Sequence, residues 1–157
     1  MTINRIKKKI CVAIFSRANY GSIKKVLEEL KKNKNIHLQI LTGGSANIEK
    51  YGLTSKIIKK DNFKIDEEIY FFVDGDKPVT MVKTTALGMI ETSTALQRLK
   101  PDIVLTIGDR YETMATVISA SYMNIPIAHT MGGEVSGTID ESIRHAITKF
   151  SHIHFPA

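Results

Sequence analysis

The sequence predicts an α/β fold, a doubly wound parallel sheet of the Rossmann-like type. Strand-like and helix-like segments alternate along the chain, which is the order that builds such sheets. The strand-like segments are continuous apolar runs, as in KICVAIF at 9–15, and strands covered on both faces have this pattern. Ionisable residues gather after two of these runs, within 102–144. Because parallel sheets bind ligands outside the carboxyl ends of their strands, we expect a functional site there.

The individual elements follow from local patterns. An amphipathic helix at 22–32, with Ile23, Val26 and Leu30 on one face, separates the first strand from a second at 36–41. Such a β-α-β unit crosses over right-handedly and pairs in parallel. Further strands are expected at 65–73, 103–107 and 125–129, with another beginning at 153–155. Further helices are expected at 45–60 (short, interrupted at Gly52), 79–99, 111–123 and 139–150.

The composition is that of an ordinary globular domain. The 157 residues are 43% hydrophobic and 24% charged, enough for one domain with a sizeable core. The net charge of +6 comes from 22 basic and 16 acidic residues, and many of the lysines lie on expected helix faces and strand leads. No aromatic platform or helix-turn-helix pattern accompanies them, so we expect no nucleic-acid partner. Attraction of an anionic small substrate fits this charge better.

The single cysteine, Cys11, lies within the first apolar run, so we expect a buried structural thiol and no internal disulfide. The amino-terminal sequence MTINRIKKKICVAIF places basic residues before an apolar run, as a signal peptide does. The run at 10–15 is too short for that purpose, and no small-residue cleavage site follows it. No stretch approaches the ~18 apolar residues of a membrane helix. We therefore expect a cytoplasmic protein without a membrane partner.

The first group of candidate residues, Gly108-Asp109-Arg110, directly follows the strand expected at 103–107. Gly108 allows a tight turn, and Asp109 either caps the next helix or supplies a functional carboxylate. Arg110 favours the functional interpretation, because a guanidinium group binds phosphate and sugar oxygens. Arg17 lies after the first strand, where Rossmann-like sheets bind phosphate, and is either a ligand contact or an exposed loop residue.

A second polar segment, HTMGGEVSGTIDESIRH at 129–145, follows the fifth expected strand. Its glycines let the chain pass close to a ligand, and backbone N–H groups there can hold anionic oxygens. Thr138 and Glu141 have the spacing of a helix capping box, which gives Glu141 a structural role. Asp140 and Arg144, four residues apart, form either a helix-surface ion pair or part of the site. The candidates in this segment are Gly132, Gly133, Glu134, Ser136, Asp140, Arg144 and His145.

We expect neither a metal nor a nucleotide cofactor. Five histidines occur, but none has a zinc-site spacing such as H-E-x-x-H, and cysteine is absent from this region. His145 is therefore expected to face the ligand or to satisfy a core hydrogen bond. The lack of G-x-G-x-x-G disfavours a dinucleotide such as NAD.

Three motifs in order, RANYG, GDRYE and H-x-x-GGEVSGTIDESIRHAITK, resemble the UDP-N-acetylglucosamine 2-epimerase family. The similarity is closer to its hydrolysing branch, which serves sialic and legionaminic acid synthesis, and spans essentially the whole chain. It implies a two-domain sugar-nucleotide fold with the active site in the cleft between the domains, of which 1–157 is the N-terminal half. The chain stops as a strand begins, which also fits a domain cut from a longer protein. The isolated chain is then expected to be inactive.

The resemblance also implies a reaction. UDP is eliminated across C1 and C2 of the sugar to give a glycal, and water then adds at C1 with inversion at C2. Removal of the C2 proton needs a base close to the ring, and expulsion of UDP needs cationic help for the diphosphate. By resemblance, Asp109 and Asp140 match acidic residues implicated in catalysis, and Arg17 and Arg110 match positions near the nucleotide and sugar.

Met131 departs from the family pattern. Many relatives have Glu at this place, as in H-I-E-G-G-E, and a thioether cannot exchange protons. Either Glu134, Asp140 or His145 takes that role, or the substrate differs, as in branches that resemble the hydrolases of 2,4-diacetamido sugars. The alternatives to an epimerase are one half of a two-domain glycosyltransferase and a non-catalytic sugar-nucleotide-binding domain. By resemblance the full-length protein is a homo-oligomer, dimer or tetramer, with the helix at 79–99 as a candidate interface.

Overall fold

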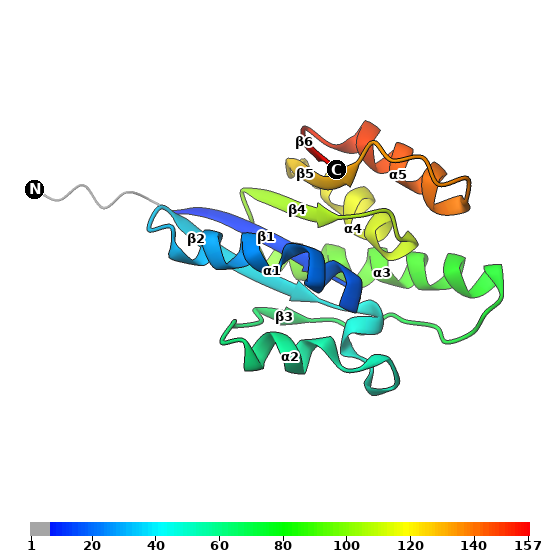
Figure 1. Ribbon diagram of the computed structural model, residues 1–157, viewed down its shortest axis with the longest axis horizontal. Helices are drawn as coiled ribbons and strands as arrows, with labels where there is room; N and C mark the ends of the chain where they lie inside the picture. The colour runs from blue at the N-terminus through cyan, green and yellow to red at the C-terminus, as the bar shows by residue number, and fades with distance from the viewer. Residues whose placement is uncertain (1–6) are drawn as a thin grey trace, which may run out of the picture.

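The computed structural model describes residues 7–157, which form one sheet of six parallel strands with helices on both faces. The strand order is β3-β2-β1-β4-β5-β6, so the chain winds outward from β1 and then outward from β4 in the other direction (Figure 1). This order confirms the predicted doubly wound, Rossmann-like sheet. The strands are β1 (Lys8–Ile14), β2 (Ile36–Thr42), β3 (Glu67–Glu68), β4 (Ile103–Ile107), β5 (Ile127–Gly132) and β6 (Ile153–Pro156).

The helices divide between the two faces of the sheet. α1 and α2 cover one face, and α3, α4 and α5 cover the other (Figure 1). The division follows from right-handed crossovers, because reversing the winding direction moves the connecting helices to the opposite face. The helices are α1 (Arg17–Lys32), α2 (Thr54–Lys60), α3 (Pro78–Leu99), α4 (Tyr111–Tyr122) and α5 (Ile139–Phe150), with 3-10 turns η1 (Gly44–Asn47) and η2 (Glu49–Tyr51).

Each face of the sheet has its own hydrophobic core. Successive side chains of β1 point to opposite faces, so Cys11 and Ala13 pack on the α3–α5 side while Val12 and Ile14 pack on the α1 side. All four are buried, which explains the lack of polar alternation in this strand. The predicted buried cysteine is confirmed, and burial raises the pKa of the Cys11 thiol to about 12.

The strand predicted at 65–73 is wrong for most of its length. Only Glu67–Glu68 pairs with the end of β2. Beyond it the side chains of Ile69 and Phe71 are buried in the core on the α3 side, although their backbone forms no strand. The alternating apolar side chains of this segment pack into the core beside the edge of the sheet. In the sequence, this pattern cannot be distinguished from that of a strand.

Two helices differ from the predicted bounds by more than one residue. α1 begins earlier than expected, at Arg17, because the Ser16 hydroxyl caps it by accepting a hydrogen bond from the Asn19 N–H at 3.2 Å. The predicted 45–60 helix is instead η1, η2 and α2 in succession. The expected interruption at Gly52 is confirmed, since this residue has φ of +89° and ends η2.

An apolar groove of about 260 Å³ remains open on the α1 side of the sheet. It lies between α1 and the strands β4, β5 and β6, and its lining includes Val26, Leu30, Leu105, Ile153 and Phe155. Within residues 7–157, no helix has the length and apolar character required to cross a membrane. The start of the basic lead-in predicted before the first strand lies outside the described residues.

Candidate active site at the carboxyl edge of the sheet

The carboxyl ends of β1, β4 and β5 lie at one edge of the sheet, where the segments that lead into α1, α4 and α5 begin (Figure 1). Gly108-Asp109-Arg110 connects β4 to α4, and the glycine-rich loop, residues 132–138, leads into α5. Parallel sheets present their helix N-termini and ligand-binding loops at this edge. The two polar segments identified in the sequence therefore share one edge.

Arg144 connects these two segments. It is buried, with 4% of the residue exposed, and its guanidinium group forms an ion pair with Asp109. The same group donates hydrogen bonds to the carbonyl oxygen of Glu134 and, at 3.3 Å, to the hydroxyl of Ser136. Its Nε has no hydrogen-bond partner among residues 7–157. A buried guanidinium needs a paired charge, and Asp109 supplies it.

Asp109 is not a helix cap. The N-cap position of α4 is Arg110, and within the described chain no side chain accepts a hydrogen bond from that helix start. Asp109 instead directs one carboxylate oxygen to Arg144 and keeps 26% of its side chain exposed. The carboxylate is thus fixed at a strand end and remains accessible to a ligand.

Glu141 holds the glycine-rich loop from the α5 side. Its carboxylate accepts hydrogen bonds from the backbone N–H groups of Gly137 at 2.5 Å and Ser136 at 2.8 Å. These two bonds hold the pKa of Glu141 below its usual value. The structural role predicted for Glu141 is confirmed, but its partners precede the N-cap Thr138, whose own side chain makes no capping bond. The side chain of Glu134 is exposed on this loop.

Asp140 and Arg144 do not form the helix-surface pair that their spacing allows, because Arg144 points toward Asp109. Asp140 is half-buried in the first turn of α5. Burial lowers the pKa of Arg110, but its hydrogen bonds to Glu112 and the charges of Glu112 and Asp140 outweigh this effect and raise it. Among these charges, that of Asp140 makes the smallest contribution to the pKa of Arg110.

Sequence reasoning missed Glu112, a fully buried carboxylate beside this cluster. Arg110 donates to it from Nε to Oε2 at 3.0 Å and from Nη2 to Oε1 at 2.8 Å, whereas 41% of the Arg110 side chain is exposed. In the sequence, Glu112 ends the GDRYE motif and is an acidic residue in the first turn of a helix. Such residues are common because they stabilise helix N-termini, so the pattern does not indicate burial.

Asn19, which was also missed, links two strand ends. Its Nδ2 donates to the carbonyl oxygen of Ile107 at 3.2 Å, and its Oδ1 accepts from the N–H of Phe15 at 3.2 Å. The amide thus holds the start of α1 against the strand end that carries Asp109. Arg17, at the first position of α1, is exposed and takes no part in the Arg144 network within the described residues.

Two histidines of this region differ in role. The His129 ring is buried, and its Nε2 donates to the carbonyl oxygen of Gly108 at 2.8 Å, which fixes the turn before Asp109. Burial lowers the pKa of His129, so the ring is neutral near pH 7. His145 is exposed, and its Nε2 lies 3.9 Å from Oε1 of Glu141. Because the ring is exposed, the alternative of a core hydrogen bond for His145 is wrong.

Met131 lies where β5 enters the glycine-rich loop. Its φ is +64°, in the left-handed region that non-glycine residues seldom adopt. The pairing of β5 with β6 shifts register between Thr130 and Gly132, and Met131 is the residue between them, 37% exposed. In the described part of the chain, no group of three or more His, Cys, Asp or Glu side chains is arranged to hold a metal ion.

These features define a class of protein, a Rossmann-like domain with a charged site at its carboxyl edge. A family model described as UDP-N-acetylglucosamine 2-epimerase matches residues 28–157. The chain therefore belongs to the UDP-N-acetylglucosamine 2-epimerase family.

Several relatives are similar over almost the whole chain. The GDP/UDP-N,N'-diacetylbacillosamine 2-epimerase (hydrolyzing) of Campylobacter jejuni is 38% identical over 150 residues, which are 95% of this chain and 39% of that protein. The UDP-N,N'-diacetylbacillosamine 2-epimerase (hydrolyzing) of Legionella pneumophila is also 38% identical, over 96% of this chain and 40% of that protein. The crystal structure of a Neisseria meningitidis UDP-GlcNAc 2-epimerase bound to UDP-GlcNAc gives a TM-score of 0.81 at 20% identity, covering 94% of this chain and 40% of that one. The chain thus spans about 40% of the length of these proteins.

Proposed function

We propose that this chain is the N-terminal domain of a hydrolysing UDP-HexNAc 2-epimerase, which releases UDP from a UDP-linked N-acetylhexosamine and forms an N-acetylmannosamine-type sugar. One observation carries the proposal. The ion pair of Asp109 and Arg144 joins two polar segments at one sheet edge, in a chain 38% identical to hydrolysing 2-epimerases. The proposal includes no metal and no cofactor.

The proposed reaction has two steps. First, a base removes the C2 proton, the C1–O bond to UDP breaks with its electrons leaving on the diphosphate, and a C1–C2 double bond forms. Second, the oxygen of water bonds to C1 and a proton is delivered to C2 from the opposite face. A carboxylate near the ring can transfer the proton, and guanidinium groups can stabilise the charge on the departing diphosphate.

Asp109 and Asp140 are the proposed proton-transfer residues. Asp109 is oriented by Arg144 and partly exposed, and Asp140 is half-buried without an ion pair to Arg144. Glu134 and His145 are the further candidates for the role that Met131 cannot fill, because both side chains are exposed and accessible to a ligand.

The remaining candidates are proposed to bind the substrate. Arg110 is half-exposed and oriented by Glu112, so it can donate to oxygens of the nucleotide sugar. Arg144 is proposed to shape the loop that contacts the sugar, since it already holds that loop through two hydrogen bonds. The other proposed contacts are Arg17, Gly132, Gly133 and Ser136.

The proposed substrate is a UDP-linked 2,4-diacetamido sugar, with UDP-GlcNAc as the alternative. Two relatives at 38% identity are named for diacetylbacillosamine, and Met131 fits a site that differs from the Glu-containing pattern. The proposed product class fits a role in sialic or legionaminic acid synthesis. A cytoplasmic location fits its buried, unpaired cysteine.

A second domain is proposed to complete the active site. The relatives are about two and a half times as long as the matched region, since the chain spans 39% and 40% of them. The open apolar groove over β4, β5 and β6 is a surface of the kind that another part of a larger protein covers. The isolated chain is therefore expected to release no UDP.

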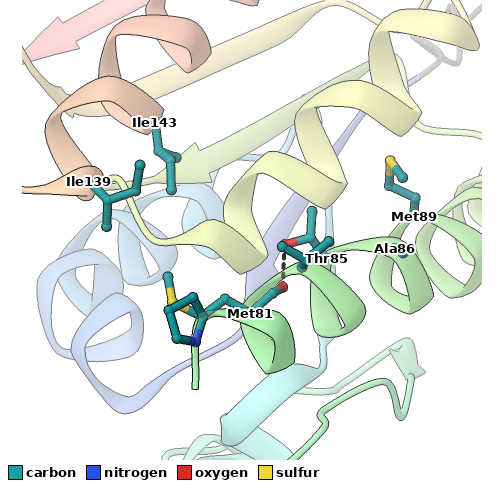
Figure 2. Close-up of a pocket in the computed structure, with 8 residues that line it drawn as sticks. Met81, Thr85, Ala86, Met89, Ile139 and Ile143 are labelled. Carbon is teal, nitrogen blue, oxygen red and sulfur yellow. Dashed lines mark hydrogen bonds between the residues drawn. The ribbon is translucent and has the colours of Figure 1, made fainter. Parts of the chain in front are cut away.

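For the full-length protein we propose self-association through α3. One side of α3 packs against α4, and the exposed apolar residues of the helix include Val79, Val82, Leu87 and Ile90. The same surface continues into an apolar groove of about 660 Å³ between α3 and α5, which Val82 also lines. Figure 2 shows Met81 and Met89 on one side of this groove and Ile139 and Ile143 on the other. Apolar surface of this extent is typical of a protein–protein interface.

The test of this function is turnover by the longer protein to which the chain belongs. It is incubated in D₂O with UDP-GlcNAc and with the UDP-2,4-diacetamido sugar, and UDP release is followed by NMR. We expect UDP release from the diacetamido sugar with deuterium at C2 of the product, and loss of release in Asp109→Asn and Asp140→Asn. Turnover of neither substrate would reject the assignment.

A further inference from the structure

Glu112 and Arg110 form a pair that is more constrained than a surface ion pair. The Glu112 carboxylate is fully buried at the start of α4, and both of its oxygens accept hydrogen bonds from Arg110. The η1 turn packs against its stem, because a Cβ at Gly44 would lie 3.5 Å from Cγ of Glu112. With one side against η1 and its charge facing Arg110, the carboxylate has a single orientation.

The other side of Arg110 is open. A guanidinium group has five N–H donors, and the bidentate contact uses two of them. The side chain makes no further hydrogen bond within residues 7–157, and 41% of it is exposed. The centre of the Tyr111 ring lies 5.5 Å from Cζ of Arg110, so the ring limits movement of the guanidinium group on one of its flat faces. The two bonds to Glu112 therefore hold the guanidinium plane and leave three of its donors unused, on a residue next to Asp109 in the chain.

The chain contains a natural comparison. Arg98 donates to Glu67 with the same two-bond geometry, at 2.8 and 2.9 Å, but at the far side of the sheet where β3 meets the end of α3. There 20% of the Glu67 side chain is exposed, against 1% for Glu112. Full burial of Glu112 goes beyond what such a pair needs for its own formation.

We propose that Glu112 is a positioning residue, which holds the guanidinium group of Arg110 so that its remaining donors meet an oxygen of the leaving diphosphate. The inference rests on the proposed function and names a residue for it beyond the catalytic set. Because Glu112 neutralises Arg110, the pair acts through directed hydrogen bonds more than through net charge. Such donors act most strongly when negative charge grows on the leaving oxygen as C1–O breaks.

The test is Glu112→Gln in the longer enzyme, because glutamine keeps the size and one acceptor oxygen but not the charge. We expect kcat for UDP release to fall by about 10- to 100-fold. KM should not rise, and it should depend more steeply on salt, because Arg110 then carries an unneutralised charge. Glu67→Gln, the matched control, should leave kcat and KM within about twofold.

A double-mutant cycle separates positioning from a general loss of stability. In an Arg110→Gln background, adding Glu112→Gln should change kcat by less than about twofold, since the group that it orients is already gone. An equal loss of kcat in both backgrounds would overturn the inference. So would an unchanged kcat in the single variant, or an equal loss in Glu67→Gln.

A separate readout covers the case in which the proposed function fails, which would appear as no UDP release by the wild-type enzyme. In the ¹⁵N-labelled 157-residue chain, the side-chain Nε–H NMR signal of Arg110 should be resolved, be lost in Glu112→Gln and persist in Glu67→Gln. An Arg110 signal unaltered by Glu112→Gln would overturn the positioning role regardless of turnover.

Discussion

At the scale of single residues, the site depends on pairs that are distant in sequence. Asp109 and Arg144 are 35 residues apart and meet only because β4 and β5 are neighbours in the sheet. The local pattern around each residue indicates a different partner, a helix N-terminus for Asp109 and Asp140 for Arg144. The contact that forms is the one that compensates a buried guanidinium, since leaving that charge unpaired is the more unfavourable outcome.

This pairing predicts a difference in stability between two aspartates. Asp109→Asn leaves Arg144 buried without a full counter-charge and should lower the free energy of unfolding by about 1–3 kcal/mol. Asp140→Asn removes no ion pair to Arg144 and should change it by less than about 0.5 kcal/mol. Urea denaturation of the chain measures both values. Equal losses in the two variants would contradict the assigned role of Arg144.

His129 predicts a dependence of stability on pH. Its pKa is lowered in the folded protein by burial, so the unfolded chain binds the proton more readily. The stabilisation is therefore complete above the unfolded pKa of about 6.5 and is lost as the pH falls below it, by at most about 1.4 kcal/mol per pH unit. His129→Gln, which keeps a donor toward Gly108, should show a shallower loss of Tm between about pH 7.5 and about pH 5.5. A slope identical to that of the wild type would contradict a neutral buried ring.

At the scale of elements, turns decide where the site residues lie. The 3-10 turn η1 follows β2 and packs beside Glu112, and this close approach depends on Gly44. Its φ is +54°, and a Cβ there would lie 2.9 Å from the backbone oxygen of Phe15. Glycine is the residue that fits both the backbone angle and the space.

Two glycines are therefore expected to respond in opposite ways to alanine. Gly44→Ala should lower the free energy of unfolding by about 2 kcal/mol or more, because of its left-handed backbone and the close carbonyl. Gly21→Ala lies inside α1 with no neighbour within 4 Å of the added methyl group and should raise it by about 0.5–1 kcal/mol. Thermal and urea denaturation of the two variants measure these changes. A neutral Gly44→Ala would show that η1 can move away from Glu112.

At the scale of the whole molecule, the surfaces left open indicate what the domain contacts. The charged edge is formed by the segments that follow the carboxyl ends of β4 and β5. The apolar groove lies over β4–β6 on one face of the sheet, and apolar residues of α3 are exposed on the opposite face. An apolar patch on each face, with the proposed site at the edge between them, is consistent with a domain that contacts a second domain and a second copy separately.

The α3 surface predicts self-association that a single charge disrupts. Val82 is 67% exposed, so Val82→Asp should leave the fold intact and weaken dimer formation by at least about 10-fold. Val26→Asp, on α1 and away from α3, makes the same chemical change and should leave dimer formation unaltered. Sedimentation velocity of the full-length protein measures both. A wild-type chain that remains monomeric at all concentrations would refute this interface.

Much of the fold was determined by the sequence alone. Buried parallel strands leave continuous apolar runs, and surface helices leave three- and four-residue spacings, so β4, α3 and α5 lie where local pattern placed them. The strand prediction for 65–73 was wrong for most of its length, because its alternating apolar side chains fill the core while the backbone beyond Glu68 pairs with no strand of the described chain. Backbone pairing was the decisive feature there, and local pattern does not distinguish a buried strand from a buried extended segment.

The site divides in the same way. The sequence determined that Asp109, Arg110 and the glycine-rich loop follow strand ends, because polar residues after an apolar run are a local feature. Only the tertiary structure decided that Arg144 pairs with Asp109 and that Glu112 is buried beneath Arg110. These pairings depend on which charged groups lose contact with water when the chain folds. Desolvation is a property of the folded molecule rather than of any single segment of the sequence.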